Sequence, residues 1–167
     1  PELSAIECSI GAFSNLGELA NDISGWLVDS MGKLAKDIET SICFGMPRCA
    51  RNSHYISQVI VDKNGSLVGY YDKVHVAQFG ASAEKPYFNP GDHVTIFELG
   101  TFRIGIVICY DMRFSEYISK MVQEHKLDAM LHPVAFSRDG SFASWRSFVR
   151  TRALVNQIYW LSLNRAG

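Results

Sequence analysis

The chain has 167 residues, of which 47% are hydrophobic, and this is enough for one domain with a substantial buried core. Its formal net charge of −1 excludes the strongly basic surface on which binding to nucleic acid or to an anionic membrane depends. No apolar run approaches the roughly 20 residues that span a bilayer, and the first residues lack the basic and apolar regions of a signal peptide. We therefore expect a cytoplasmic protein with no nucleic-acid or membrane partner.

The first third of the chain predicts a helix that packs on a flat partner. Residues 1–14 show neither a helical nor a strand period. Between residues 16 and 38, apolar side chains recur at intervals of three or four, which is typical of an amphipathic helix, with a possible interruption near Ser24-Gly25. The apolar stripe of that helix must lie against a sheet or another helix.

A β-hairpin is expected next. Residues 41–46 and 54–61 read as buried strands, and residues 67–71 as the strand that returns after a turn at Asn64-Gly65. Asn-Gly supplies the positive φ angles that a tight reversal needs. Lys73 follows the returning strand.

The second half alternates strands with helices. We expect a long loop at 77–92, a hairpin of strands 94–97 and 102–108, a helix at 115–126, a strand at 127–132, a loop at 133–140, a helix at about 141–157 and a final buried strand at 158–163. Long loops in compact domains tend to be functional. Mixed sheets with helices on one outer face satisfy this order, so the predicted class is α/β, with a second sheet covering the inner face.

Cys109 directly follows the apolar run 102–108. The carboxyl end of a buried strand in an α/β layer is where ligands collect, because the next helix starts there. A thiol at that point is well placed to attack a substrate, although an ordinary buried cysteine is the alternative. The other cysteines are Cys8, Cys43 and Cys49. None forms a C-x-x-C pair or has a partnered histidine, so we expect no metal site. A chain of this size with a core of its own needs no disulfide framework, so we expect a reducing cytoplasm.

Three motifs resemble the carbon-nitrogen hydrolase (nitrilase) superfamily, which carries Glu, Lys and Cys in this order, each at a strand end. They are Pro1-Glu2, Tyr71-Asp72-Lys73-Val74-His75 and Ile106-Val107-Ile108-Cys109-Tyr110-Asp111-Met112-Arg113-Phe114. The likeness extends to Glu84 with Pro90-Gly91, to His132-Pro133, to Trp145 and to residues 152–159. One departure is Val155, where relatives commonly have Glu.

The resemblance implies a four-layer α-β-β-α sandwich that forms one domain over residues 1–167. Family members have a strand-helix-strand unit before the Pro-Glu step and further strands after the Asn164-Arg165 region, so we expect this domain to be partial. By the same resemblance, subunits pair through helices near the nucleophile. A homodimer or larger homo-oligomer is therefore expected.

The chemistry implied is amide hydrolysis through a thioester, without metal or cofactor. Cys109 would be the nucleophile, and Glu2 the general base that takes the thiol proton and passes it to the leaving amine. Lys73, with the backbone N–H just after Cys109, would stabilise the oxyanion. Glu84 would keep Lys73 charged and oriented. Without the resemblance, the plain alternative is that these residues are solvated surface residues; this applies to Glu2, Lys73 and Glu84.

Histidine offers a rival base. His75 or His132 could pair with Cys109, and activity of a Glu2→Gln variant would separate that scheme from the one above. We interpret His75 as a packing group and His132 as a residue that lines the site at a strand end.

The residues after the nucleophile resemble the amidase and ω-amidase branches more than true nitrilases. Arg113 could grip a substrate carboxylate, or form an ion pair within the chain. The residues expected to bind the small amide substrate are Tyr110, Arg113, His132, Val134, Ala135 and Phe136. An N-carbamoyl hydrolase, a nitrilase, or an inactive remnant that acts only as a binding module are the alternatives.

Overall fold

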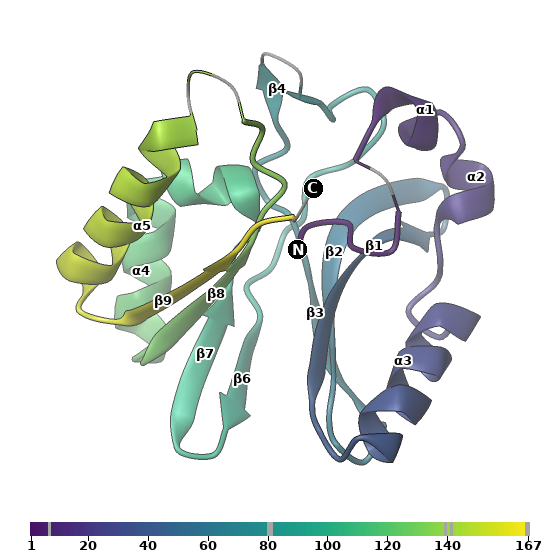
Figure 1. Cartoon of the computed structure of the whole chain (residues 1–167), viewed down its shortest axis with the longest axis horizontal. Coiled ribbons are helices and arrows are strands. Elements are labelled where there is room, and N and C mark those ends of the chain that lie inside the picture. The colour runs from purple at the N-terminus through teal and green to yellow at the C-terminus, as the bar shows by residue number, and fades with distance from the viewer. Residues whose placement is uncertain (7, 80–81, 139, 141, 166–167) are drawn as a thin grey trace. The chain divides into compact units, whose positions relative to one another are not determined.

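A computed structural model describes residues 1–6, 8–79, 82–138, 140 and 142–165 (Figure 1). These residues form two compact units. One unit spans Glu2–His93, and the other spans Val94–Gly167 together with Pro1. Each unit packs helices on a β-sheet, so the predicted α/β class is confirmed. Among the described residues, no helix combines the length and the hydropathy needed to cross a membrane.

The unit Glu2–His93 contains an antiparallel sheet in the order β1-β2-β3 and a separate two-stranded ribbon, β4-β5. Its strands are β1 (Ile42–Ala50), β2 (Ser53–Val61), β3 (Leu67–Asp72), β4 (Gln78–Phe79) and β5 (Ser82–Ala83). Its helices are α1 (Ile10–Phe13), α2 (Leu16–Leu19) and α3 (Trp26–Asp37). The ribbon β4-β5 lies within the segment predicted to be a plain loop. Residues 80–81 of that segment lie outside the described residues.

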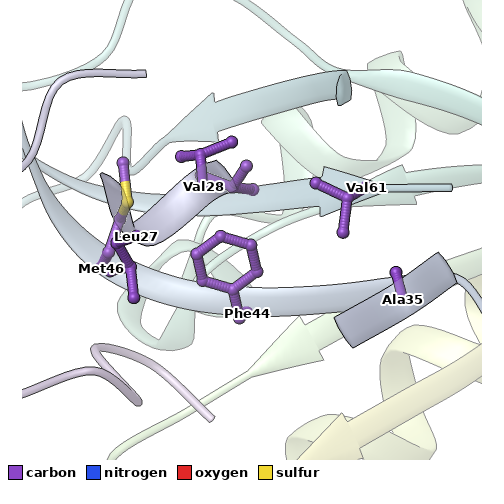
Figure 2. Packing of buried hydrophobic residues seen from close by; sticks show 7 residues of the cluster. Leu27, Val28, Ala35, Phe44, Met46 and Val61 are labelled. Atoms are coloured by element: carbon purple, nitrogen blue, oxygen red, sulfur yellow. The ribbon is translucent and has the colours of Figure 1, made fainter. Parts of the chain in front are cut away.

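Helix α3 covers one face of this sheet, as its apolar stripe predicts. Leu27, Val28 and Ala35 of α3 pack against Phe44 and Met46 of β1 and against Val59 and Val61 of β2 (Figure 2). The helix does not extend back to residue 16, because residues 20–25 leave the helical path. There Asn21 pairs with the end of β1: its N–H donates to the Pro47 carbonyl, and its carbonyl accepts from Cys49.

The turn between β2 and β3 follows the Asn64-Gly65 prediction. Gly65 has φ of +86°, a conformation that favours glycine. The Asp62 carboxylate accepts hydrogen bonds from the backbone N–H groups of Asn64 and Ser66. The turn also touches α3, since a Cβ on Gly32 would lie 2.6 Å from the Gly65 carbonyl oxygen.

The second unit has a mixed sheet in the order β6-β7-β8-β9, antiparallel between β6 and β7 and parallel thereafter. In chain order its elements are β6 (Ile96–Leu99), β7 (Phe102–Ile106), the 3-10 helix η1 (Cys109–Arg113), α4 (Ser115–His125), β8 (Ala129–Pro133), α5 (Phe142–Asn156) and β9 (Tyr159–Leu163). Residues 139 and 141, which fall in the predicted loop and at the predicted start of the last helix, lie outside the described residues.

Helices α4 and α5 lie on the same side of this sheet in Figure 1. Ile118, Met121 and Val122 of α4 pack on Val107 and Met130 in a core of their own. Gly105 makes this close packing possible, because a Cβ there would lie 2.6 Å from the Leu127 Cδ1 atom.

The prediction that the last strand is buried is wrong for one of its faces. Tyr159, Leu161 and Leu163 of β9 are 68%, 53% and 61% exposed. The intervening Trp160 and Ser162 are partly buried on the other face. The strand therefore alternates with a period of two, although its sequence is apolar nearly throughout.

Candidate active site

Lys73 lies at the end of β3, between two carboxylates. Its Nζ atom is 2.6 Å from Glu2 Oε1 and 2.8 Å from both Glu84 carboxylate oxygens. The three residues are 1%, 1% and 5% exposed for Glu2, Lys73 and Glu84. Glu2 and Glu84, which lie 71 and 11 positions from Lys73 along the chain, thus both contact its buried ammonium group. We refer to Glu2, Lys73 and Glu84 as the charged cluster.

The charged cluster contains one more carboxylate than it has ammonium groups to neutralise. Burial raises the pKa of the Glu84 carboxyl above its usual value, and the nearby Lys73 ammonium opposes this shift only in part. The negative charge of Glu2 raises the Glu84 pKa further. Glu84 also accepts a hydrogen bond from the Ala77 N–H at 2.8 Å. Burial beside a second carboxylate thus favours the protonated form of Glu84.

A second buried ion pair fixes the strand end that carries Lys73. Arg48 of β1 donates two hydrogen bonds to the Asp72 carboxylate, at 3.0 and 2.6 Å. The Arg48 guanidinium also lies between the rings of Tyr55 and Tyr70, 4.5 and 4.7 Å from their centroids. Ser57 donates to Asp72 as well. Because Asp72 precedes Lys73, these contacts limit the freedom of the Lys73 backbone.

The loop after Lys73 returns to the same strand end. The Gly91 N–H donates to the Lys73 carbonyl at 2.9 Å. A Cβ on Gly91 would collide with the Asp72 backbone. The loop that contains Glu84 is therefore hydrogen-bonded to the backbone of Lys73.

Cys109 begins η1, three residues after β7 ends, in the other unit. Its φ is +43°, in the left-handed region that non-glycine residues seldom occupy. Asp111, which is fully buried, accepts from the Ile108 N–H at 2.9 Å, and its own N–H donates to the Ile108 carbonyl. This reciprocal pair fixes the sharp bend at which the thiol is presented.

His132 of β8 contacts the backbone carbonyl of Cys109. The His132 Nε2 atom is 3.1 Å from the Cys109 carbonyl oxygen, and Nδ1 is 2.9 Å from Ser162 Oγ on β9. Trp145 of α5 donates its indole N–H to the same Ser162 oxygen at 2.9 Å. We refer to Trp145, Ser162, His132 and the Cys109 carbonyl as the neutral chain.

The other residues predicted to bind substrate lie near η1 and after β8. The Arg113 guanidinium stacks 5.1 Å from the Phe148 ring centroid and 5.8 Å from that of Tyr110. Val134 is fully buried, and its N–H donates to the Leu163 carbonyl. Ala135 is partly buried.

Phe136 is fixed by Asn164. The Asn164 side chain accepts from the Phe136 N–H at 2.9 Å and donates to its carbonyl at 3.2 Å. The Phe136 ring stacks on Trp145, with centroids 6.5 Å apart. Substrate contacts of these residues remain predictions.

The structure brings Glu2, Lys73 and Glu84 into contact within one unit and places Cys109 with His132 in the other. The catalytic roles of these residues, and their action as one site, remain predictions. Sequence reasoning missed Ser162, Asn164 and the Arg48–Asp72 pair, since single polar residues at strand ends carry no distinctive spacing. Across the part of the chain that is described, no group of three or more His, Cys, Asp or Glu residues could hold a metal ion.

The chain belongs to the carbon-nitrogen hydrolase family, whose model matches residues 4–167. Among curated proteins it is 27% identical to the deaminated glutathione amidase of Yersinia enterocolitica, covering 100% of this chain and 61% of that protein. It is 32% identical to the N-carbamoylputrescine amidase of Solanum lycopersicum, covering 82% of this chain and 48% of that protein. The chain thus spans about half to three fifths of the length of these relatives.

Solved structures show the same fold. A CN-hydrolase superfamily protein from Xanthomonas campestris matches with a TM-score of 0.86 at 23% identity, over 100% of this chain and 62% of that one. Nit3 of Saccharomyces cerevisiae, a member of branch 10 of the nitrilase superfamily, matches with a TM-score of 0.85 at 25% identity, over 99% and 60% of the two chains. The predicted nitrilase-like fold is confirmed.

Proposed function

We propose that this chain carries the reacting groups of an amidase that cleaves a non-peptide C–N bond of a small molecule. The observation that carries the proposal is the buried Lys73 ammonium between Glu2 and Glu84. Burying three ionisable side chains is costly and is seldom done for stability alone. Membership in the carbon-nitrogen hydrolase family supports the proposal, as do relatives that are named amidases.

In the proposed reaction, Cys109 Sγ attacks the amide carbon while Glu2 accepts the thiol proton. Lys73 and the backbone N–H after Cys109 stabilise the negative oxygen of the tetrahedral intermediate. The C–N bond breaks, Glu2 gives its proton to the leaving nitrogen, and a thioester remains on Cys109. Water then adds with Glu2 as base, the C–S bond breaks, and the proton returns to the thiol as the acid leaves.

Glu84 orients Lys73 in this scheme. Both Glu84 oxygens lie 2.8 Å from Lys73 Nζ and Glu2 Oε1 lies 2.6 Å from it, so the two carboxylates together fix the orientation of the ammonium. Because burial raises the Glu84 pKa, a proton on Glu84 would leave Lys73 and Glu2 as a matched pair of opposite charge.

The substrate class is open between a simple amide and a carbamoyl group. The likeness to N-carbamoylputrescine amidase favours the second candidate, because a carbamoyl nitrogen departs through the same tetrahedral chemistry. Action as a homo-oligomer in the cytoplasm is part of this proposal as well, and size-exclusion chromatography with light scattering would test the assembly.

The test is ammonia release from three probes: deaminated glutathione, N-carbamoylputrescine, and succinamate as an ω-amide. We expect release from at least one probe by the parent protein. We expect a loss of at least about 1,000-fold for Cys109→Ser and for Glu2→Gln. Release undiminished in Glu2→Gln would favour a histidine base. No release from any probe by a folded protein would favour an inactive remnant.

A further inference from the structure

The direction of each hydrogen bond in the neutral chain follows from the chemistry of its partners. A carbonyl oxygen can only accept, so His132 Nε2 carries a proton and donates it to Cys109. An indole N–H can only donate, so Ser162 Oγ accepts from Trp145. In a neutral imidazole, Nδ1 then accepts the Ser162 hydroxyl proton. In this arrangement both ring nitrogens of His132 have a hydrogen-bond partner.

The neutral chain therefore runs in one direction, from Trp145 through Ser162 and His132 to the Cys109 carbonyl. It links α5, β9 and β8 to the first residue of η1. His132 and Ser162 are direct partners in the parallel pairing of β8 with β9, which fixes their separation through the backbone ladder. A hydrogen-bond chain built across three elements constrains the Cys109 carbonyl more firmly than one local contact would.

The Cys109 carbonyl matters because it shares a peptide plane with the Tyr110 N–H. The described residues contain no cis peptide bond, so these two groups point in opposite directions from one rigid unit. Drawing the Cys109 oxygen toward His132 thus turns the Tyr110 N–H away from His132. The φ of +43° at Cys109 is an uncommon conformation that persists only where its surroundings fix it.

We propose that Trp145, Ser162 and His132 form a positioning device that orients the Cys109–Tyr110 peptide, and through it the backbone N–H that faces the oxyanion. His132 is thereby a positioning residue and not a general base. This inference rests on the proposed function for the identity of the oxyanion donor. It assigns a task to Ser162 and Trp145, and it gives a role to the hydrogen bond between His132 and the Cys109 carbonyl.

The test compares two reactions of one thiol. Acylation of Cys109 by p-nitrophenyl acetate builds a negative oxygen, whereas alkylation by iodoacetamide does not. Both rates are followed on the Cys109 peptide by mass spectrometry, so Cys8, Cys43 and Cys49 do not interfere. Neither reagent needs amide hydrolysis, and therefore a failure of the proposed function does not remove the readout.

Two variants of His132 form the matched pair. The amide nitrogen of His132→Gln reaches the position of Nε2 and can still donate to the Cys109 carbonyl, whereas His132→Asn reaches only the position of Nδ1. We expect acylation to fall about 100-fold in His132→Asn, as expected for a misplaced oxyanion donor, with alkylation within about threefold of the parent. In His132→Gln both rates should stay near those of the parent.

Three outcomes would overturn the proposal: equal acylation by the Asn and Gln variants, an equal loss of acylation and alkylation in His132→Asn, or unchanged acylation in His132→Asn. If His132→Asn does not fold, Trp145→Phe replaces it, since that change removes only the first donor of the chain. Trp145→Phe should lower acylation by about threefold to tenfold and spare alkylation. Equal effects of Trp145→Phe on acylation and alkylation would also contradict the proposal.

Discussion

The two units of this protein fix their reactive groups by different physical means. In Glu2–His93, interactions between full charges fix the group, because a buried ammonium is bound by two carboxylates. In the unit that contains Cys109, a chain of hydrogen bonds from Trp145 through Ser162 and His132 ends on the Cys109 carbonyl.

The difference teaches how each arrangement responds to change. Buried charges interact strongly, but they depend on protonation and are costly when one partner is removed. Neutral hydrogen bonds are individually weaker, yet they carry direction, which charges do not. Neutral hydrogen bonds suit a group whose orientation must be fixed, and buried charges suit a group that acts by electrostatic stabilisation.

The largest effect should come from removing the only cation of the charged cluster. Lys73→Met removes the ammonium that the buried Glu2 and Glu84 carboxylates share, and we expect a loss of about 3–5 kcal/mol in the free energy of unfolding, measured with urea. The triple variant Glu2→Gln, Lys73→Met, Glu84→Gln should recover most of this loss, since these three positions then bury no charge. A loss below about 1 kcal/mol for Lys73→Met would show that charge does not dominate this unit.

A smaller effect is expected in the neutral chain. Ser162→Ala removes the acceptor of the Trp145 N–H and the donor to His132, which should cost about 1–3 kcal/mol in urea unfolding. The double variant Ser162→Ala, Trp145→Phe should cost less than the sum of its single changes, because the second change removes a donor that the first left without its acceptor. Strict additivity would mean that Trp145 and Ser162 are not coupled.

The smallest effect is a pH dependence that separates the two arrangements. Burial raises the Glu84 pKa above its ordinary value of 4.5, so the folded state retains this proton longer than the unfolded state does. The associated stability is present below pH 4.5 and is lost as the pH rises through the raised value. The free energy of unfolding of Glu84→Gln, minus that of the parent, should therefore increase as the pH rises from 4.5 through the raised pKa of Glu84 and then level off.

Ser162→Ala serves as the control for that pH series, because serine does not titrate there. Its stability difference from the parent should change less with pH than that of Glu84→Gln. A flat profile for Glu84→Gln would show that the Glu84 carboxyl titrates alike in the folded and unfolded states.

The sequence predicted those parts of the fold that local chemistry decides. Asn64-Gly65 identified the hairpin turn, and the apolar stripe identified α3. Helix α1 was missed because four residues are too few to show a period; its Ser9 cap is the only local signal. The exposed face of β9 was missed because Tyr159, Leu161 and Leu163 are as apolar as core residues.

The candidate site divides in the same way. Glu2, Lys73, Glu84 and Cys109 were selected by motifs that match a family, and no spacing rule could have joined residues so far apart. Ser162 could not be selected at all, since its significance arises from the register of β8 with β9 and from the side of the sheet that α5 covers. Pairing across strands is a tertiary property, which a single strand's sequence does not contain.

Gly91 shows how an uncharged position can control an electrostatic one. A methyl group there would displace the Asp72 backbone, and with it the partner of Arg48 and the stem of Lys73. A Gly91→Ala replacement, which looks harmless in a substitution table, would therefore behave like the deletion of a charge. In screening natural variants of this protein, substitutions of Gly91 should therefore be ranked with substitutions of the ionisable residues.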